Sequence, residues 1–121
     1  MSPHPIVHIE FSAKDREAAA LFYQELFGWQ VQQMPEANYA TFNPGEGPGG
    51  GFSPVGENNP AGTVMVYIDT DDIEASLAKA ESLGATTVYP KTEIPNTGWF
   101  AFFKDPTGNI VGLYTAMQES T

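Results

Sequence analysis

The sequence of 121 residues contains no cysteine, only two histidines and only five lysine and arginine residues. Without cysteine there is no disulfide, no thiolate nucleophile and no thiolate metal ligand, so a metal ion would need histidine, carboxylate or water ligands. The fifteen acidic residues give a net charge of −10, which repels nucleic acid and anionic membranes and attracts cations. The same charge can also serve solubility alone.

The sequence also lacks long hydrophobic runs and several well-known catalytic motifs. No apolar run approaches the roughly twenty residues needed to span a bilayer, and the first five residues lack the basic and apolar regions of a signal peptide. The glycine run at residues 49–51 lacks the lysine of a phosphate-binding loop, and no nucleophile elbow is present. We therefore expect a cytoplasmic protein with no membrane or nucleic-acid partner, folded as one domain over residues 1–121.

One structural pattern occurs twice in the chain: an apolar strand followed by an amphipathic helix that ends at glycine. The first copy begins at residues 6–11 and ends at Gly28, and the second begins at residues 64–68 and ends at Gly84. Such a duplication predicts two similar modules with a site between them. In the first strand, apolar residues alternate with His8 and Glu10, so these two side chains share one face.

The two predicted helices have apolar stripes with helical spacing. The first helix is capped by Ser12 or Asp15 and covers the face opposite His8. Its stripe consists of Ala19, Phe22, Tyr23 and Leu26. The second helix starts at Asp71 or Asp72, and its stripe consists of Ile73, Leu77 and Ala80.

Short β-type patterns complete each half of the chain. They lie at residues 29–34, 39–42, 50–53, 65–69, 86–89, 99–103 and 110–115. Each half is therefore predicted to be βαβββ, with module one at about residues 5–54 and module two at about residues 62–116. The fold class is α+β.

Four segments carry a resemblance to a known family. They are VHIEF at residues 7–11, ALFYQELFGW at 20–29, DDIEA at 71–75 and KDPTGN at 104–109. In this order and spacing they resemble the vicinal oxygen chelate superfamily, which includes glyoxalase I, bleomycin-resistance proteins and extradiol dioxygenases. The resemblance implies a bowl-shaped mixed sheet with the helices outside, a small-molecule ligand inside and a homodimer.

The resemblance also implies a divalent metal cofactor held by histidine and carboxylate or amide side chains at four strand positions. His8 occupies the first of these positions. The equivalent position in the second half is Met65, the final-strand position is Gly112, and the remaining position falls in residues 50–52, where there is no carboxylate. One imidazole cannot hold a catalytic ion that normally needs three protein ligands, so the sequence predicts a degenerate metal site.

Two functions stay open from the sequence. The first is binding or sequestration of a small apolar or cationic ligand, as in bleomycin-resistance proteins. Its predicted binding residues are His8, Glu10, Phe52, Met65, Tyr67, Trp99 and Tyr114. The second is a metal-dependent glyoxalase-like lyase, isomerase or dioxygenase that uses a displaced site of His8, Glu10 and Asp69. His8 can equally be a structural histidine hydrogen-bonded to Glu10, and strand parity does not decide which aromatic set faces the helices.

Overall fold

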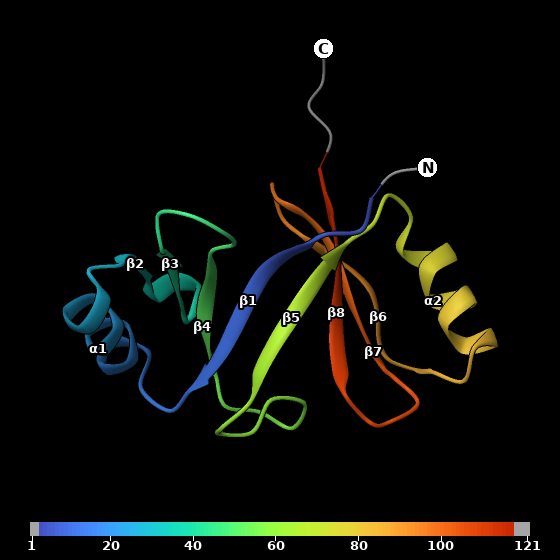
Figure 1. Cartoon of the computed structure of the whole chain (residues 1–121), viewed down its shortest axis with the longest axis horizontal. Coiled ribbons are helices and arrows are strands. Elements are labelled where there is room, and N and C mark those ends of the chain that lie inside the picture. Colours follow the sequence, from blue (N-terminus) through green and yellow to red (C-terminus); the bar gives the residue numbers. More distant parts are fainter. Residues whose placement is uncertain (1–2, 118–121) are drawn as a thin grey trace, which may run out of the picture. The chain divides into compact units, whose positions relative to one another are not determined.

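The computed structural model describes residues 3–117, which form two compact units. The N-terminal module comprises residues 7–66, and the C-terminal module comprises the described residues from 67 onward together with residues 3–6. Both consist of four strands and one longer helix, which confirms the α+β class and the βαβββ repeat (Figure 1). In the described part of the chain, no helix is long and apolar enough to cross a membrane.

The N-terminal module has its strands in the order β2-β3-β4-β1, with β1 and β4 parallel and the other neighbours antiparallel. Its elements are β1 (Ile6–Ala13), α1 (Arg16–Phe27), β2 (Gln30–Met34), the 3-10 helix η1 (Pro35–Ala37), β3 (Tyr39–Asn43) and β4 (Gly50–Pro54). Asp15 caps α1 by accepting a hydrogen bond from the Ala18 amide at 3.1 Å. The helix ends at Gly28, whose φ of 74° is a left-handed conformation that glycine adopts without strain.

The C-terminal module repeats this plan with the order β5-β8-β7-β6, in which β5 and β8 are parallel. Its elements are β5 (Val64–Asp69), α2 (Ile73–Ser82), β6 (Thr86–Ile94), β7 (Gly98–Lys104) and β8 (Ile110–Ala116). Asp72 caps α2 through a hydrogen bond from the Ala75 amide at 3.0 Å. The β6 strand is longer than the segment predicted from the sequence, because its pairing with β7 continues to Ile94.

Aromatic rings fill the core beneath α1. Phe11, Phe42 and Phe52 pack together with Tyr23 and with Trp29, which stacks on Phe42 at 4.6 Å. The predicted stripe of α1 is wrong at two positions, because Phe22 and Leu26 are 59% and 56% exposed. The helix approaches the strands through the small side chain of Ala20, and the rings from the strands and from Trp29 occupy the space that larger helix residues would fill.

The core beneath α2 is mainly aliphatic, and here the predicted stripe is confirmed at Ile73 and Leu77, while Ala80 is only partly buried. Ile73 and Leu77 are buried against Ala101 of β7 and Leu113 of β8. Trp99 is partly buried on the same side.

A tight turn joins β7 to β8. The Asp105 carboxylate accepts hydrogen bonds from the backbone amides of Thr107, Gly108 and Asn109 at 2.9–3.0 Å. It also accepts one from the Asn109 side chain, which is the main reason that the pKa of Asp105 lies below its usual value. The turn starts the pairing at Lys104 and Ile110, and this register places Phe100 opposite Tyr114.

Candidate functional site

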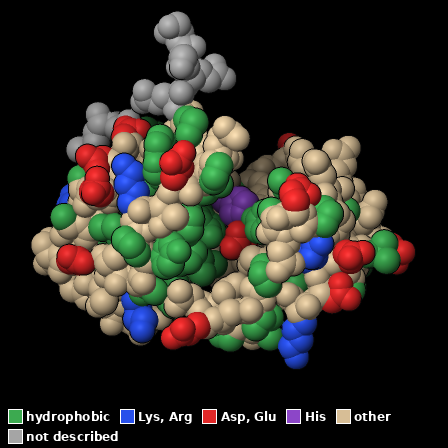
Figure 2. All heavy atoms as spheres, turned by 180° about the vertical axis from the view of Figure 1, so that it is seen from behind, with side chains coloured by type: hydrophobic (Ala, Val, Ile, Leu, Met, Phe, Trp, Pro, Cys, Tyr) green, Lys and Arg blue, Asp and Glu red, His purple; other side chains and the backbone are tan. Residues whose placement is uncertain are grey.

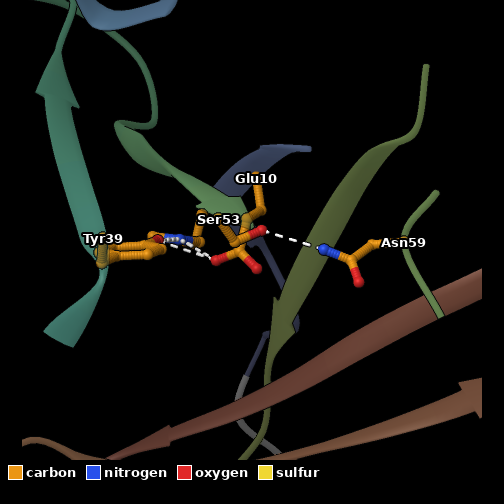
Figure 3. A network of polar contacts seen from close by, with 5 residues as sticks. Glu10, Tyr39, Ser53 and Asn59 are labelled. Carbon is orange, nitrogen blue, oxygen red and sulfur yellow. Dashed lines mark hydrogen bonds and ion pairs between the residues drawn. The ribbon is translucent and has the colours of Figure 1, made fainter. Parts of the chain in front are cut away.

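A polar cluster lies on the face of the N-terminal sheet that α1 leaves uncovered. Ile9 and Phe11 pack toward α1, so the alternation of β1 directs His8 and Glu10 to the other face, as the sequence predicted. Tyr39 joins them from β3 (Figure 3). Its hydroxyl lies 2.8 Å from His8 Nε2 and donates to Glu10 Oε2 at 2.8 Å, while His8 Nε2 lies 3.3 Å from the same oxygen.

The Tyr39 hydroxyl links the two side chains. It donates to Glu10, and its oxygen can accept from His8, which is consistent with the histidine tautomer that carries hydrogen on Nε2. The Glu10 side chain is 15% exposed and the His8 side chain 32% exposed. A carboxylate and an imidazole are thus held together in fixed orientations and can both still be reached by a small molecule.

Polar character continues along β4. Asn59 donates from Nδ2 to the Ser53 hydroxyl at 3.2 Å and to the Pro54 carbonyl at 2.9 Å. Ser53 is in register with Ser12, two residues beyond Glu10 on β1, and its contact with Asn59 is drawn in Figure 3. The loop before β5 is therefore tied to the same strand that carries Gly51 and Ser53.

The ring of Tyr39 occupies the space over Gly51. A Cβ atom at Gly51 would overlap the ring and hydroxyl of Tyr39, so only glycine fits at this position with the ring where it is. Gly51 belongs to the segment in which the family resemblance expects a metal ligand. The position holds a tyrosine ring from the neighbouring strand instead of a carboxylate.

An aromatic surface lies on the uncovered face of the C-terminal module. Tyr89 stacks on Phe100 at 5.6 Å with an interplanar angle of 11°, and Phe102 contacts both Phe100 at 5.4 Å and Tyr67 at 5.9 Å. Tyr114 is paired with Phe100 across the β7–β8 hairpin. Burial, followed by the negative charge of Asp69, raises the pKa of Tyr114.

A second tyrosine lies over a second glycine in this module. Tyr67 is in register with Gly112, and a Cβ atom there would come within 2.5 Å of the Tyr67 ring. Gly112 is the position at which the resemblance expects the final-strand carboxylate. The space beside Gly112 is therefore filled by the chain's own ring.

The structure divides the residues predicted to line one site. Phe52 is fully buried beneath α1, and Trp99 lies on the α2 side with the Lys91 ammonium 5.3 Å from its ring. Both are thus on helix-covered faces, away from the uncovered faces that carry the other predicted residues. Met65, on β5, is 3% exposed.

Sequence reasoning missed four residues of the uncovered faces: Tyr39, Tyr89, Phe100 and Phe102. The turn at residues 105–109 was a usable signal for two of them. Counting back from a turn that pairs Lys104 with Ile110 places Phe100 beside Tyr114 and Trp99 on the opposite face.

Within either module of residues 3–117, the donor side chains are too few for a catalytic metal ion. Within residues 3–117, no group of three or more histidine, cysteine, aspartate or glutamate side chains is arranged to hold one. His8 and Glu10 supply two donors in the N-terminal module, whereas a catalytic zinc-type site needs three protein ligands and an open position. Asp69 belongs to the C-terminal module, where its carbonyl oxygen lies 2.9 Å from His4 Nδ1.

Comparisons with known proteins agree with the fold. A family model described as a glyoxalase-like domain matches residues 8–113. A Mycobacterium bovis protein named "Putative glyoxylase CFP32" is 32% identical over 117 residues, which cover 89% of this chain and 44% of the relative. The chain thus spans less than half the length of that relative.

Solved structures show the same architecture. A glyoxalase/bleomycin resistance protein/dioxygenase superfamily member from Vibrio splendidus superposes with a TM-score of 0.69 and 14% identity, covering 93% of this chain and 99% of that one. A Mn(II)-bound glyoxalase from Novosphingobium aromaticivorans gives a TM-score of 0.65 and 18% identity, covering 96% of this chain and 42% of that one.

Proposed function

Because the chain belongs to the glyoxalase-like domain family, we propose that it is a small-molecule-binding member that works without a resident metal ion. Its ligand is a small organic cation with an apolar body. The alternative is a metal-dependent lyase, isomerase or dioxygenase using His8, Glu10 and Asp69. Of these residues, His8 and Glu10 are in contact within one module, and the alternative is an outcome of the test below.

The observation that carries this proposal is the pairing of tyrosine with glycine at two expected ligand positions. Tyr39 lies over Gly51 and Tyr67 lies over Gly112, so each position lacks a donor side chain and its space is filled by a ring. Placing a carboxylate at either glycine would require the ring to move. Tyrosine rings therefore occupy the space beside both glycines. His8, the expected ligand that is present, lies within hydrogen-bond distance of Tyr39.

The uncovered aromatic face supports a cationic ligand. Rings attract a cation through their negative faces, and the effect grows as water is excluded. The negative charge of Asp69 contributes to the raised pKa of Tyr114, so a carboxylate acts electrostatically at this aromatic face. Acidic side chains are spread over the face of the molecule in Figure 2, and the net charge of −10 speeds the approach of a cation.

The polar cluster supports recognition of a hydrogen-bonding group. Glu10 accepts a hydrogen bond from Tyr39, whose hydroxyl also lies within hydrogen-bond distance of His8 Nε2, so both side chains are held in place. Side chains that are fixed before a ligand arrives lose little conformational entropy on binding. Each module thus offers its own surface: oriented polar groups in the N-terminal module and aromatic rings in the C-terminal module.

Calorimetric titration of Mn²⁺, Ni²⁺, Zn²⁺ and Fe²⁺ into tag-free, chelator-treated protein tests the metal-free part of the proposal. We expect no tight binding at one site per chain. Micromolar or tighter binding that is lost in His8→Ala would instead support the metal-dependent function, and Glu10→Ala and Asp69→Ala would then identify the other ligands.

Titration with benzyltrimethylammonium and with its neutral carbon isostere tests the ligand class. We expect the cation to bind more tightly, and Phe102→Leu to weaken its binding. Phe103→Leu is the matched control, because Phe103 is the next residue on β7 and packs on the α2 side. Equal binding of both compounds, or an equal loss in both variants, would contradict the proposal.

The homodimer and the cytoplasmic location predicted from the sequence stay predictions. Sedimentation equilibrium at micromolar concentration tests the first, and a monomer under those conditions would contradict it. Neither outcome changes the ligand experiment, since each module's uncovered face is formed by residues of one chain.

A further inference from the structure

An open pocket lies on the α1 side of the N-terminal module, away from the polar cluster. It has a volume of about 370 Å³, within the range of small-molecule sites. Its walls include the rings of Phe11 and Tyr23, Ala19 and Phe22 of α1, and residues 62–63 of the loop before β5. The buried Phe52 ring packs against Phe11 and Tyr23. All of these residues belong to residues 7–66, so the pocket is formed within one module.

The rings that line the pocket are nearly parallel. The Phe11, Tyr23 and Phe52 centroids lie 5.3–5.7 Å apart, and the interplanar angles are 21–26°. This offset stacking is the arrangement that aromatic groups prefer, and the pocket offers space for one more ring beside it.

The chemistry of the lining selects a neutral ligand. None of the lining residues is charged, and the only polar side chains among them are Ser12, Tyr23 and Thr63. A charged ligand would lose its hydration without gaining a partner of opposite charge. The overall negative charge of the chain further disfavours an anion.

The loop wall of the pocket is fixed by hydrogen bonds. The Ser12 amide and hydroxyl both donate to the Thr63 carbonyl, at 3.1 and 3.3 Å, and the Thr63 amide donates to the Pro60 carbonyl at 3.1 Å. The wall is therefore anchored to β1 without any ligand. A pocket formed in advance costs less conformational entropy to fill.

From these observations we infer that the α1 side of the N-terminal module holds a second binding site, for a small neutral aromatic molecule. This site is separate from the uncovered sheet faces. It does not depend on the proposed cation site.

Titration with 2-naphthol, followed by amide and indole NMR shifts of the labelled full chain, tests the inference. Trp29 stacks on Tyr23 at 5.2 Å and 12°, so its indole signal reports on a ring placed against Tyr23. We expect saturable shifts at Ala19, at residues 62–64 and at the Trp29 indole. No saturable shift up to the solubility limit of the probe, or shifts centred on Glu10 and Tyr39, would overturn the inference.

Two variants in α1 make the test specific. Ala19→Met fills the pocket with an unbranched side chain that helices tolerate, and it should weaken 2-naphthol binding by about tenfold or more. Ala18→Met is the matched control, because Ala18 is exposed, adjacent and outside the lining, so its affinity should equal that of the wild type. Unchanged affinity in a folded Ala19→Met protein would contradict the inference. If the Ala19→Met protein does not fold, Ala19→Leu takes its place, and the position of the shifts in the wild type tests the site independently.

Competition separates the two sites. Benzyltrimethylammonium and 2-naphthol should bind the wild type together without mutual displacement. Displacement of one by the other would show a shared site and overturn the inference. Failure of 2-naphthol to bind would leave the cation experiment unaffected.

Discussion

In the N-terminal module the stacked aromatic rings lie beneath the helix, whereas in the C-terminal module the stacked rings lie on the opposite, uncovered face. Trp99 and Phe103 are exceptions, since they pack on the α2 side. Under α1 the core is a ring stack around Phe52, whereas under α2 it is built on Ile73 and Leu77. The uncovered faces differ as well. The face of the N-terminal module carries the polar cluster of His8, Glu10 and Tyr39, and the face of the C-terminal module carries the rings around Phe100.

The difference shows that a repeated backbone does not require a repeated chemistry. The βαβββ plan needs one face of each sheet to be apolar enough to pack against its helix, and either aromatic or aliphatic residues satisfy that need. The other face is then free to differ. Here one face specialises in hydrogen bonds and the other in ring contacts.

The largest expected effect is the loss of an aromatic ring from the core beneath α1. Phe52→Ala should destabilise the protein by about 3–5 kcal/mol, because the side chain is fully buried and its neighbours cannot close the cavity completely. Phe102→Ala, on the uncovered face, should cost clearly less because Phe102 is only partly buried. Urea denaturation measures both, and equal losses would contradict the division of roles between the faces.

Adding one methyl group at either tyrosine-covered glycine should have the next largest effect. Gly51→Ala and Gly112→Ala should each cost roughly 1–3 kcal/mol of unfolding free energy, because the new Cβ overlaps a tyrosine ring. The cost of Gly51→Ala should fall when Tyr39→Ala is present. A double-mutant cycle that gives no coupling between residues 39 and 51 would show that the Tyr39 ring is not the reason why residue 51 is glycine.

Removal of the Tyr39 hydroxyl should have a smaller effect. Tyr39→Phe keeps the ring over Gly51 but deletes the hydrogen bonds to His8 and Glu10, which should cost about 0.5–1.5 kcal/mol. Tyr114→Phe is the comparison, since its hydroxyl donates only one longer bond, to the Thr97 carbonyl at 3.3 Å. A larger loss for Tyr114→Phe in thermal or urea unfolding would reverse the predicted order.

The smallest effect concerns the titration of Tyr114. Its pKa is raised in the folded state, so the folded protein holds this proton more tightly than the unfolded chain does. The resulting stability is present below about pH 10, the usual pKa of tyrosine, and is lost as the pH rises through the folded value. Asp69→Asn should lower the pKa of Tyr114, measured by NMR titration of labelled tyrosine. An unchanged pKa of Tyr114 in the variant would show that Asp69 does not act electrostatically on the aromatic face.

Most of the fold was predictable because its signals are local. Asp15, Gly28 and Asp72 define helix ends through their own backbone and side-chain chemistry, and the alternation of β1 placed His8 and Glu10 together. Alternation did not show which face of β7 packs against α2, because Trp99 on one face and Phe100 on the other are both aromatic. The answer depends on the pairing of β7 with β8, whose register is set by the turn at Asp105.

The tyrosine–glycine pairs were not predictable for a similar reason. The sequence showed that residues 50–52 and Gly112 lack the expected ligands, but which ring fills the space beside Gly51 or Gly112 depends on neighbouring strands. In one module the ring comes from β3 and in the other from β5. In both modules a tyrosine ring thus fills the space beside a glycine, but the tyrosine belongs to a different strand of the repeat in each.

The most direct test of the central claim is one titration done twice, with benzyltrimethylammonium added to chelator-treated protein and to protein supplied with diamagnetic Zn²⁺, both followed by NMR. We predict the same affinity in the two samples, with shifts at Phe100, Phe102 and Tyr114. Binding that appears only with Zn²⁺, and disappears in His8→Ala, would contradict the account and show that this chain binds its ligand through a metal ion.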